Sequence, residues 1–150
     1  MGRRKKTIPT DKATIEEFRR YLWVFRLAAG WTAYELSERF GVSKGTIGKI
    51  ECREKRLSVA YYLAIRYLLE NEHDYYIDTL MRIMLDPKVK REEKEHIAQK
   101  AYAIRKKVGG KVTIKKVSQE FRTYTIVGHE LVKVKIEGEN YEKESENRAV

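Results

Sequence analysis

The sequence predicts an α+β protein, with an all-α N-terminal half of four to five helices, further helices, and a small C-terminal antiparallel β-hairpin or meander. Two observations support this class. Apolar residues recur at spacings of three and four through most of residues 14–107, in segments bounded by capping residues and glycines. After Gly109-Gly110 the pattern changes to alternation, with Val112 and Ile114 separated by polar residues.

The N-terminal segments are delimited by residues that start and end helices. Residues 1–13 are expected to be a flexible basic arm. We expect Thr14 to cap a helix that runs to Ala29 and ends at Gly30. Thr32 is expected to cap a short second helix through residue 40, and Ser43 a third that reaches residue 52.

The next segments continue this pattern. A basic loop over residues 52–56 is followed by a fourth helix that Ser58 caps, and residues 14–71 together form the predicted first domain. A break at 71–73 precedes an apolar helix over 74–85, and Pro87 ends that helix or starts a charged one over 88–107.

The last predicted elements are strands. Residues 112–115, 121–127 and 132–136 read as strands, and Gly128-His129 resembles a hairpin turn. We treat residues 72–138 as a second module for dimerisation or partner binding, and residues 139–150 as a polar tail. The commoner explanation of the apolar helix in this second module is core packing, and the functional one is a dimer interface. The lysine-lined hairpin could bind an acidic partner or further DNA, and a sheet edge protected by lysines is an alternative at least as good.

The chain is strongly basic, with 32 Lys and Arg against 22 Asp and Glu and a net charge of +10. Residues 1–71 carry 15 basic and 8 acidic residues, a net charge of +7. Residues 72–150 carry 17 basic and 14 acidic residues, a net charge of +3. The excess favours an anionic partner such as nucleic acid or an acidic membrane surface. A solubilising coat is the alternative that charge alone leaves open.

The single cysteine and the short apolar runs bear on the cellular setting. Cys52 has no cysteine with which to pair, which fits a reducing compartment. No apolar run follows the N-terminal basic residues, so we expect no signal peptide, and no stretch is long enough to span a bilayer. We therefore expect a cytoplasmic protein, near the nucleoid or in a host cell if viral, with no membrane partner.

The second and third predicted helices have the residue types that a steep helix crossing needs. Leu36 is the inward anchor of the first of them, and the small Ser37 lets the other approach closely. Gly41 stands where the turn needs a left-handed backbone. Ile47 and Ile50 face the core. The residues left pointing outward are Lys44, Gly45, Gly48 and Lys49.

This pattern resembles the lambda-repressor-like helix-turn-helix family of DNA-binding proteins, the Cro and XRE type. The match extends from Phe18 to Leu69, about a third of the chain. The residues that carry it are Arg26, Gly30-Trp31-Thr32, Glu35-Leu36-Ser37, Gly41-Val42-Ser43, Thr46-Ile47 and Ile50-Glu51. The resemblance implies a structural ion pair between Arg26 and Glu51.

The resemblance also implies a set of DNA-contacting residues. Lys44, Gly45 and Lys49 occupy positions that face base edges, and Thr46 lies near phosphates. Where relatives often have a glutamine that touches DNA, this chain has Ala33, and Gly45 offers no side chain to a base. The full predicted DNA-binding set is Thr32, Ala33, Ser43, Lys44, Gly45, Thr46, Lys49, Arg53, Lys55, Arg56 and the arm residues Arg3, Arg4, Lys5 and Lys6. The loop and arm cations are alternatively solvated surface charges.

The sequence therefore predicts a sequence-specific regulator of transcription, of repressor type, that binds double-stranded DNA as a homodimer on two half-sites. One alternative is a helix-turn-helix protein whose C-terminal module binds and inhibits another protein, as antitoxins and viral inhibitors do. Another is a non-specific architectural DNA-binding protein, because the recognition surface offers few side chains to bases.

Enzymatic chemistry has no recognisable motif in this sequence. Ser118 and Ser145 lie in no peptidase pattern, and Gly109-Gly110 lacks the remainder of a phosphate-binding loop. The three histidines, His73, His96 and His129, are scattered without metal-ligand spacing. We expect no catalytic activity, no cofactor and no metal.

Overall fold

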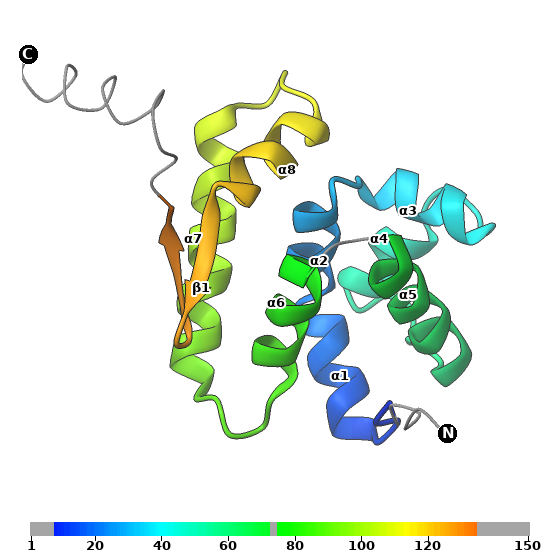
Figure 1. The fold of residues 1–150 in the computed structure, drawn as a ribbon. Helices are drawn as coiled ribbons and strands as arrows, with labels where there is room; N and C mark the ends of the chain where they lie inside the picture. The colour runs from blue at the N-terminus through cyan, green and yellow to red at the C-terminus, as the bar shows by residue number, and fades with distance from the viewer. Residues whose placement is uncertain (1–7, 73–74, 135–150) are drawn as a thin grey trace, which may run out of the picture.

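The computed structural model describes residues 8–72 and 75–134. These contain eight helices and one two-stranded antiparallel sheet, which confirms the predicted α+β class (Figure 1). The elements are α1 (Lys12–Arg20), α2 (Leu22–Ala29), α3 (Ala33–Phe40), α4 (Thr46–Glu51), α5 (Val59–Glu72), α6 (Tyr75–Leu85), α7 (Arg91–Val108), α8 (Ile114–Arg122), β1 (Tyr124–Val127) and β2 (Glu130–Lys133).

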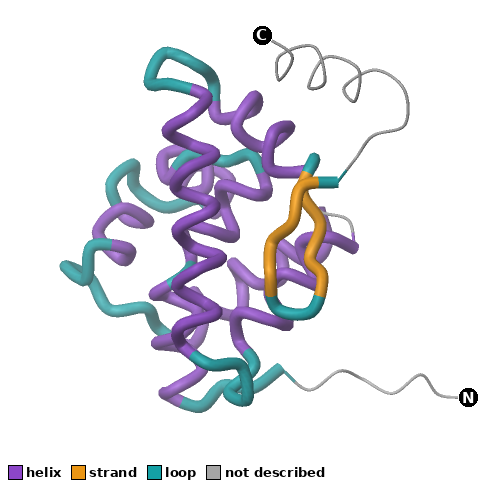
Figure 2. Tube along the Cα trace, turned by 90° about the vertical axis from the view of Figure 1, so that its left-hand side faces the viewer, coloured by secondary structure: helices purple, strands orange, loops and turns teal. Residues whose placement is uncertain are grey.

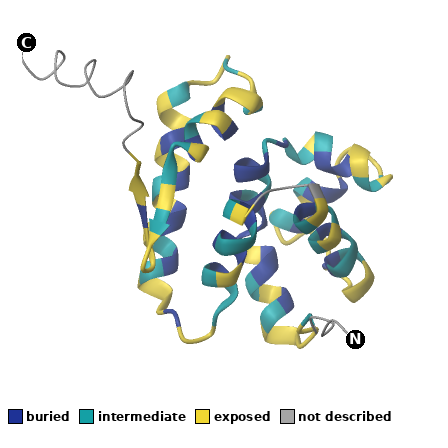
Figure 3. Cartoon of the chain, viewed as in Figure 1, coloured by how far each residue is buried: buried dark blue, intermediate teal, exposed yellow. Residues whose placement is uncertain are grey.

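Helix α2 is the centre of the fold. Six of its eight residues are buried, which is the pattern of a helix enclosed on most sides. Helices α1, α3, α5, α6, α7 and α8 all pack against it, and buried residues from both halves of the chain form one apolar cluster (Figure 3). In that cluster the ring of Phe18 lies 5.4 Å from the ring of Phe25 and 5.1 Å from that of Tyr62.

The hairpin lies along α7, as Figure 2 shows. Tyr124 pairs with Lys133 and Val127 with Glu130, so the predicted turn at Gly128-His129 is present. Gly128 has a φ of 62°, which glycine adopts without strain. Leu131 is buried between the sheet and the core, whereas the alternate residues of β2 are exposed. The predicted strand residue Ile136 lies outside the described residues.

The predicted strand at 112–115 is wrong, and with it the three-stranded meander. Residues 114–122 form helix α8, which buries Val117, Ser118 and Phe121. Val117 and Phe121 are four residues apart, a helical spacing that the short alternation of Val112 and Ile114 concealed. The strand predicted over 121–127 consequently begins only at Tyr124.

The single helix predicted over 14–29 is also wrong, because the chain breaks at Tyr21 into α1 and α2. No glycine or proline marks this break. Tyr21 is 1% exposed and its hydroxyl donates to Glu95 of α7 at 2.8 Å. Asp11, not Thr14, caps α1: its carboxylate accepts from the Thr14 backbone N–H at 3.0 Å. Ser58 accepts from the Tyr61 N–H at 3.2 Å, as expected of a cap.

An ion-pair network joins α1 to α7. Lys94 is 4% exposed at its side chain and its ammonium donates to Glu17 at 2.8 Å. Burial raises the pKa of the Glu17 carboxyl, but the hydrogen bond and charge of Lys94, with Arg91 and Arg20 nearby, outweigh burial and hold that pKa below its ordinary value. The network therefore stabilises the fold while Glu17 is ionised.

Candidate nucleic-acid interface

The turn between α3 and α4 is built from local hydrogen bonds. Thr32 accepts from the Glu35 backbone N–H at 2.9 Å, and the Glu35 carboxylate accepts from the Thr32 N–H at 3.0 Å, so both donors at the start of α3 are satisfied. At the other end Gly41 adopts a φ of 77°. The chain can therefore reverse into α4 without strain at this position.

Ser37 joins α3 to α4. Its hydroxyl donates to the Ala33 carbonyl at 2.9 Å and accepts from the Ile47 backbone N–H at 3.2 Å. Ile47 and Ile50 are fully buried beneath α4. The inward face of α4 is thus fixed by one buried hydrogen bond and two apolar anchors, which leaves the opposite face to solvent.

The predicted ion pair between Arg26 and Glu51 is present and fixes the other end of α4. The Arg26 Nε donates to Glu51 Oε2 at 2.7 Å and its Nη2 to Oε1 at 3.0 Å, a bidentate arrangement. The Arg26 Nη1 also donates to the Trp31 carbonyl at 3.2 Å. Both charged side chains are nearly buried, with 12% and 13% exposed. This pair therefore joins α2, the α2–α3 turn and the end of α4.

The exposed side of α4 and of the turn before it carries the two lysines that the sequence predicted to point outward. Ser43, Lys44, Gly45 and Lys49 are all exposed, and neither lysine forms an ion pair with another described residue. The Lys44 ammonium lies 5.7 Å from the centre of the Tyr34 ring. Tyr34, which is 46% exposed, adds an aromatic side chain that the sequence prediction did not include.

Two predicted contact residues, Thr46 and Thr32, have hydroxyls committed to structural hydrogen bonds. Thr46 is 4% exposed, and its hydroxyl shares a 2.8 Å hydrogen bond with that of Ser43, so it is not free to reach a phosphate. Ser43 does not cap α4, which begins later at Thr46 after Gly45. The Thr32 hydroxyl is committed to the α3 cap, and Ala33 is half-buried. The side-chain contacts available on this surface are therefore fewer than predicted.

The loop after α4 adds three exposed cations, Arg53, Lys55 and Arg56. Lys55 lies 5.8 Å from the centre of the Tyr61 ring, which itself packs edge-on against Phe40 at 4.9 Å. Arg53 has a φ of 66°, unusual for a residue with a side chain. The predicted arm residues Arg3, Arg4, Lys5 and Lys6 lie outside the described residues.

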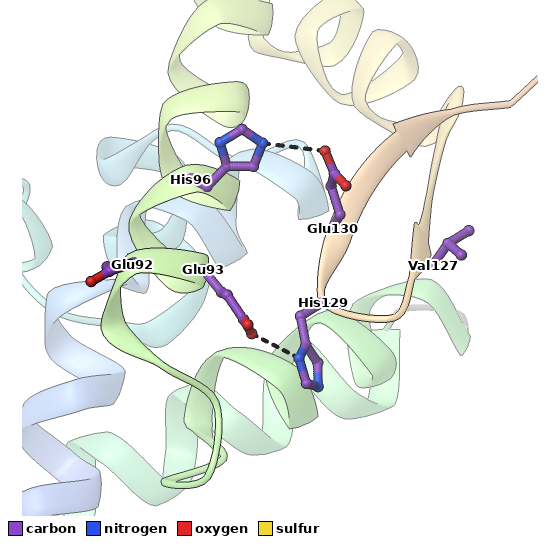
Figure 4. A pocket seen from close by; sticks show the side chains of 6 residues that line it. All are labelled: Glu92, Glu93, His96, Val127, His129 and Glu130. Atoms are coloured by element: carbon purple, nitrogen blue, oxygen red, sulfur yellow. Dashed lines mark ion pairs between the residues drawn. The ribbon is translucent and has the colours of Figure 1, made fainter.

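A separate pocket of about 460 Å³ lies between α7 and the hairpin. It brings together His96 and His129, which the sequence prediction treated as scattered (Figure 4). His129 Nδ1 lies 2.7 Å from Glu93 Oε2, and His96 Nε2 lies 3.4 Å from Glu130 Oε1. The two pairs are distinct: in the described part of the chain, no three His, Cys, Asp or Glu side chains are arranged to hold one metal ion.

Comparison with protein-family models, curated proteins and solved structures finds no match to this chain. Among residues 8–72 and 75–134, no helix combines the length and the apolar character that crossing a bilayer requires. The surface is thus defined by its own geometry, as a short helix with a buried inner face and a cationic outer face, flanked by a cationic loop.

Proposed function

We propose that this protein is a sequence-specific regulator of transcription, of repressor type, that binds double-stranded DNA as a homodimer in the cytoplasm. The observation that carries the proposal is the presentation of α4. Its inner face is fixed by Ile47, Ile50 and the Arg26–Glu51 pair. Lys49 lies exposed on its outer face, and Lys44 lies exposed in the turn just before it. A helix with side chains is about 10–12 Å across, which fits the major groove of about 12 Å.

The chemistry of this face suits a duplex. A lysine ammonium donates to the O6 and N7 acceptors of guanine, which the major groove presents. Gly45 and Gly48 add no side-chain bulk, so the backbone of α4 can lie close to the bases. The positive charge continues beyond α4 in the loop cations Arg53, Lys55 and Arg56. These side chains would neutralise backbone phosphates beside the groove that α4 enters.

The outer face of the hairpin favours a protein partner, which we take to be a second copy of the chain. Val127 and Val132 are 62% and 40% exposed, and neighbouring Val134 is 39% exposed. The sheet has only two strands, so each strand has an edge without a strand partner in the described residues. The same face is the basis of the second candidate function, in which this module binds and inhibits a different protein.

The test is a pair of lysine substitutions, one on α4 and one in the turn before it. We expect Lys44→Ala with Lys49→Ala to abolish the specific shift of a duplex selected from genomic fragments, because each removed base contact costs about 1–3 kcal/mol. The fold should persist, since both side chains are exposed. The matched control is Lys88→Ala with Lys90→Ala, which removes the same charge from two exposed lysines in the turn before α7.

Three outcomes separate the candidate functions. Loss of specific binding in the α4 variant, with the control unchanged, supports the regulator. Equal binding of all duplexes by the wild-type protein, with a steep salt dependence, supports an architectural role instead. An α4 variant that binds the selected duplex as tightly as the control does refutes the assigned positions.

A further inference from the structure

The turn between α7 and α8 carries the densest positive charge in the described residues. We call residues 105–116 the α7–α8 tip. It contains six cations and no acid, a net of +6, and every one of the six is exposed: Arg105, Lys106, Lys107, Lys111, Lys115 and Lys116. Residues 72–150 have a net charge of only +3, so the rest of that segment is net negative, at −3.

Helix stability explains only part of this charge. Arg105, Lys106 and Lys107 occupy the last turn of α7, where the helix dipole favours cations. Lys115 and Lys116, however, stand in the first turn of α8, where the same dipole disfavours them, and no acidic residue accompanies them. Of the six cations only Lys107 is in an ion pair with a described residue, Glu120 at 3.3 Å.

Helix α8, whose first turn belongs to the tip, packs against the end of α2 just before α3. The Ser118 hydroxyl of α8 donates to the Ala28 carbonyl of α2 at 3.2 Å. A Cβ added to Gly30, in the α2–α3 turn, would lie 3.0 Å from that hydroxyl oxygen. Figure 1 shows α8 and α3 towards the same end of the molecule, and the α6–α7 turn at the other. The tip therefore lies towards the end of the molecule that also holds the α2–α3 turn and α3.

We propose that the α7–α8 tip is a second, sequence-independent contact for the phosphate backbone of the duplex that α4 enters. This inference rests on the proposed function and extends its footprint beyond the helix-turn-helix. A phosphate backbone suits the tip better than a lipid surface does, because no large apolar side chain is exposed within residues 105–116 to enter a bilayer. Backbone contacts add affinity and orient the protein, whereas α4 reads sequence.

The experiment compares two triple variants of the full chain. The tip variant is Lys111→Gln, Lys115→Gln and Lys116→Gln. The control variant is Arg82→Gln, Lys88→Gln and Lys90→Gln. These are three exposed cations, one on α6 and two just before α7, a helix about 27 Å long that separates those two from the tip. Both variants lose the same charge, so an effect of net charge alone would be equal in both.

The readout is the dissociation constant for two duplexes of about 30 base pairs, one selected from genomic fragments and one of mixed sequence, between 50 and 200 mM salt. Three lost phosphate contacts reduce the slope of log K against log salt by about 2.7, so the wild-type protein should lose about 40-fold more affinity over this range than the tip variant. The change should be the same for both duplexes, and the control variant should match the wild type.

Each other result overturns the proposal. Equal slopes for the tip and control variants would show that the tip makes no phosphate contact. A tip variant with a wild-type duplex slope but weakened binding to phosphatidylserine vesicles would assign the tip to a membrane. The ratio of the affinities for the two duplexes measures sequence recognition by α4, and the salt slope measures phosphate contacts by the tip. The proposed function and the proposed tip contact can therefore be refuted independently. A wild-type protein that binds neither duplex would overturn both.

Discussion

The ion pair between Arg26 and Glu51 gives the sharpest test of how α4 is held. Glu51→Gln preserves the shape of the side chain but removes its charge. In the wild-type protein the two hydrogen bonds measure 2.7 and 3.0 Å, and the side chains are 12% and 13% exposed. The substitution leaves the Arg26 cation nearly buried, with the Trp31 carbonyl at 3.2 Å as its other acceptor.

The size of the loss follows from this burial. Breaking a buried pair from one side costs about 3–5 kcal/mol, whereas an exposed pair contributes less than about 1 kcal/mol. Because Gln can keep one hydrogen bond and the site is slightly exposed, we expect Glu51→Gln to lower the free energy of unfolding by about 2 kcal/mol. For a chain of this length that corresponds to a melting temperature lower by about 4–8 °C.

Urea unfolding followed by circular dichroism measures this loss. The matched control is Glu54→Gln, which neutralises an exposed carboxylate three residues further on and should change stability by less than about 0.5 kcal/mol. A double-mutant cycle with Arg26→Met should give a coupling of at least about 1 kcal/mol. If Glu51→Gln were no more destabilising than the control, apolar packing alone would hold α4 and the reasoning above would be wrong.

Two further predictions concern the turn glycines and the buried lysine. Gly41→Ala should lower the free energy of unfolding by about 1 kcal/mol, because Gly41 has a φ of 77° that alanine adopts only with strain. Gly48 lies inside α4, and a Cβ added there meets no atom within 4 Å, so Gly48→Ala should raise the free energy of unfolding by about 1 kcal/mol. Changes of the same sign for both variants in urea unfolding would contradict this. Lys94→Met should cost about 2 kcal/mol at pH 7. Because the pKa of Glu17 lies below its ordinary 4.5, this deficit should persist above pH 4.5 and vanish as Glu17 is protonated at lower pH; a deficit independent of pH would refute it.

Helix α3 and the turn that follows it could be predicted from sequence because their determinants are local. The Thr32–Glu35 capping box, the left-handed Gly41 and the small Ser37 act within a few residues of one another. A threonine followed three residues later by glutamate is typical of a helix start, and a glycine after the last helical residue is typical of a helix end. The pair of Arg26 with Glu51 is not local, and only the resemblance to a known family predicted it.

Helix α8 and the break at Tyr21 could not be predicted for a different reason. Val112 and Ile114 alternate over too few residues to separate a strand from the start of a helix. The contacts that favour the helix come from far along the chain, such as the hydrogen bond from Ser118 to Ala28. Tyr21 likewise interrupts a good helical pattern at a position where its hydroxyl donates to Glu95 of α7. Tertiary contacts outweigh local preference at both sites.

The same long-range contacts determine how the two cationic surfaces are related. Arg26 in the last turn of α2 is paired with Glu51 at the end of α4, and Ala28 two residues later accepts the hydrogen bond from Ser118 of α8. Both surfaces are therefore attached to the same turn of one buried helix. Surfaces joined by a flexible linker would engage a duplex in two steps, the second governed by an effective concentration. Here α2 is in contact with both α4, through the Arg26–Glu51 pair, and α8, through Ala28, so the duplex contact proposed for the two surfaces requires no linker to be ordered between them.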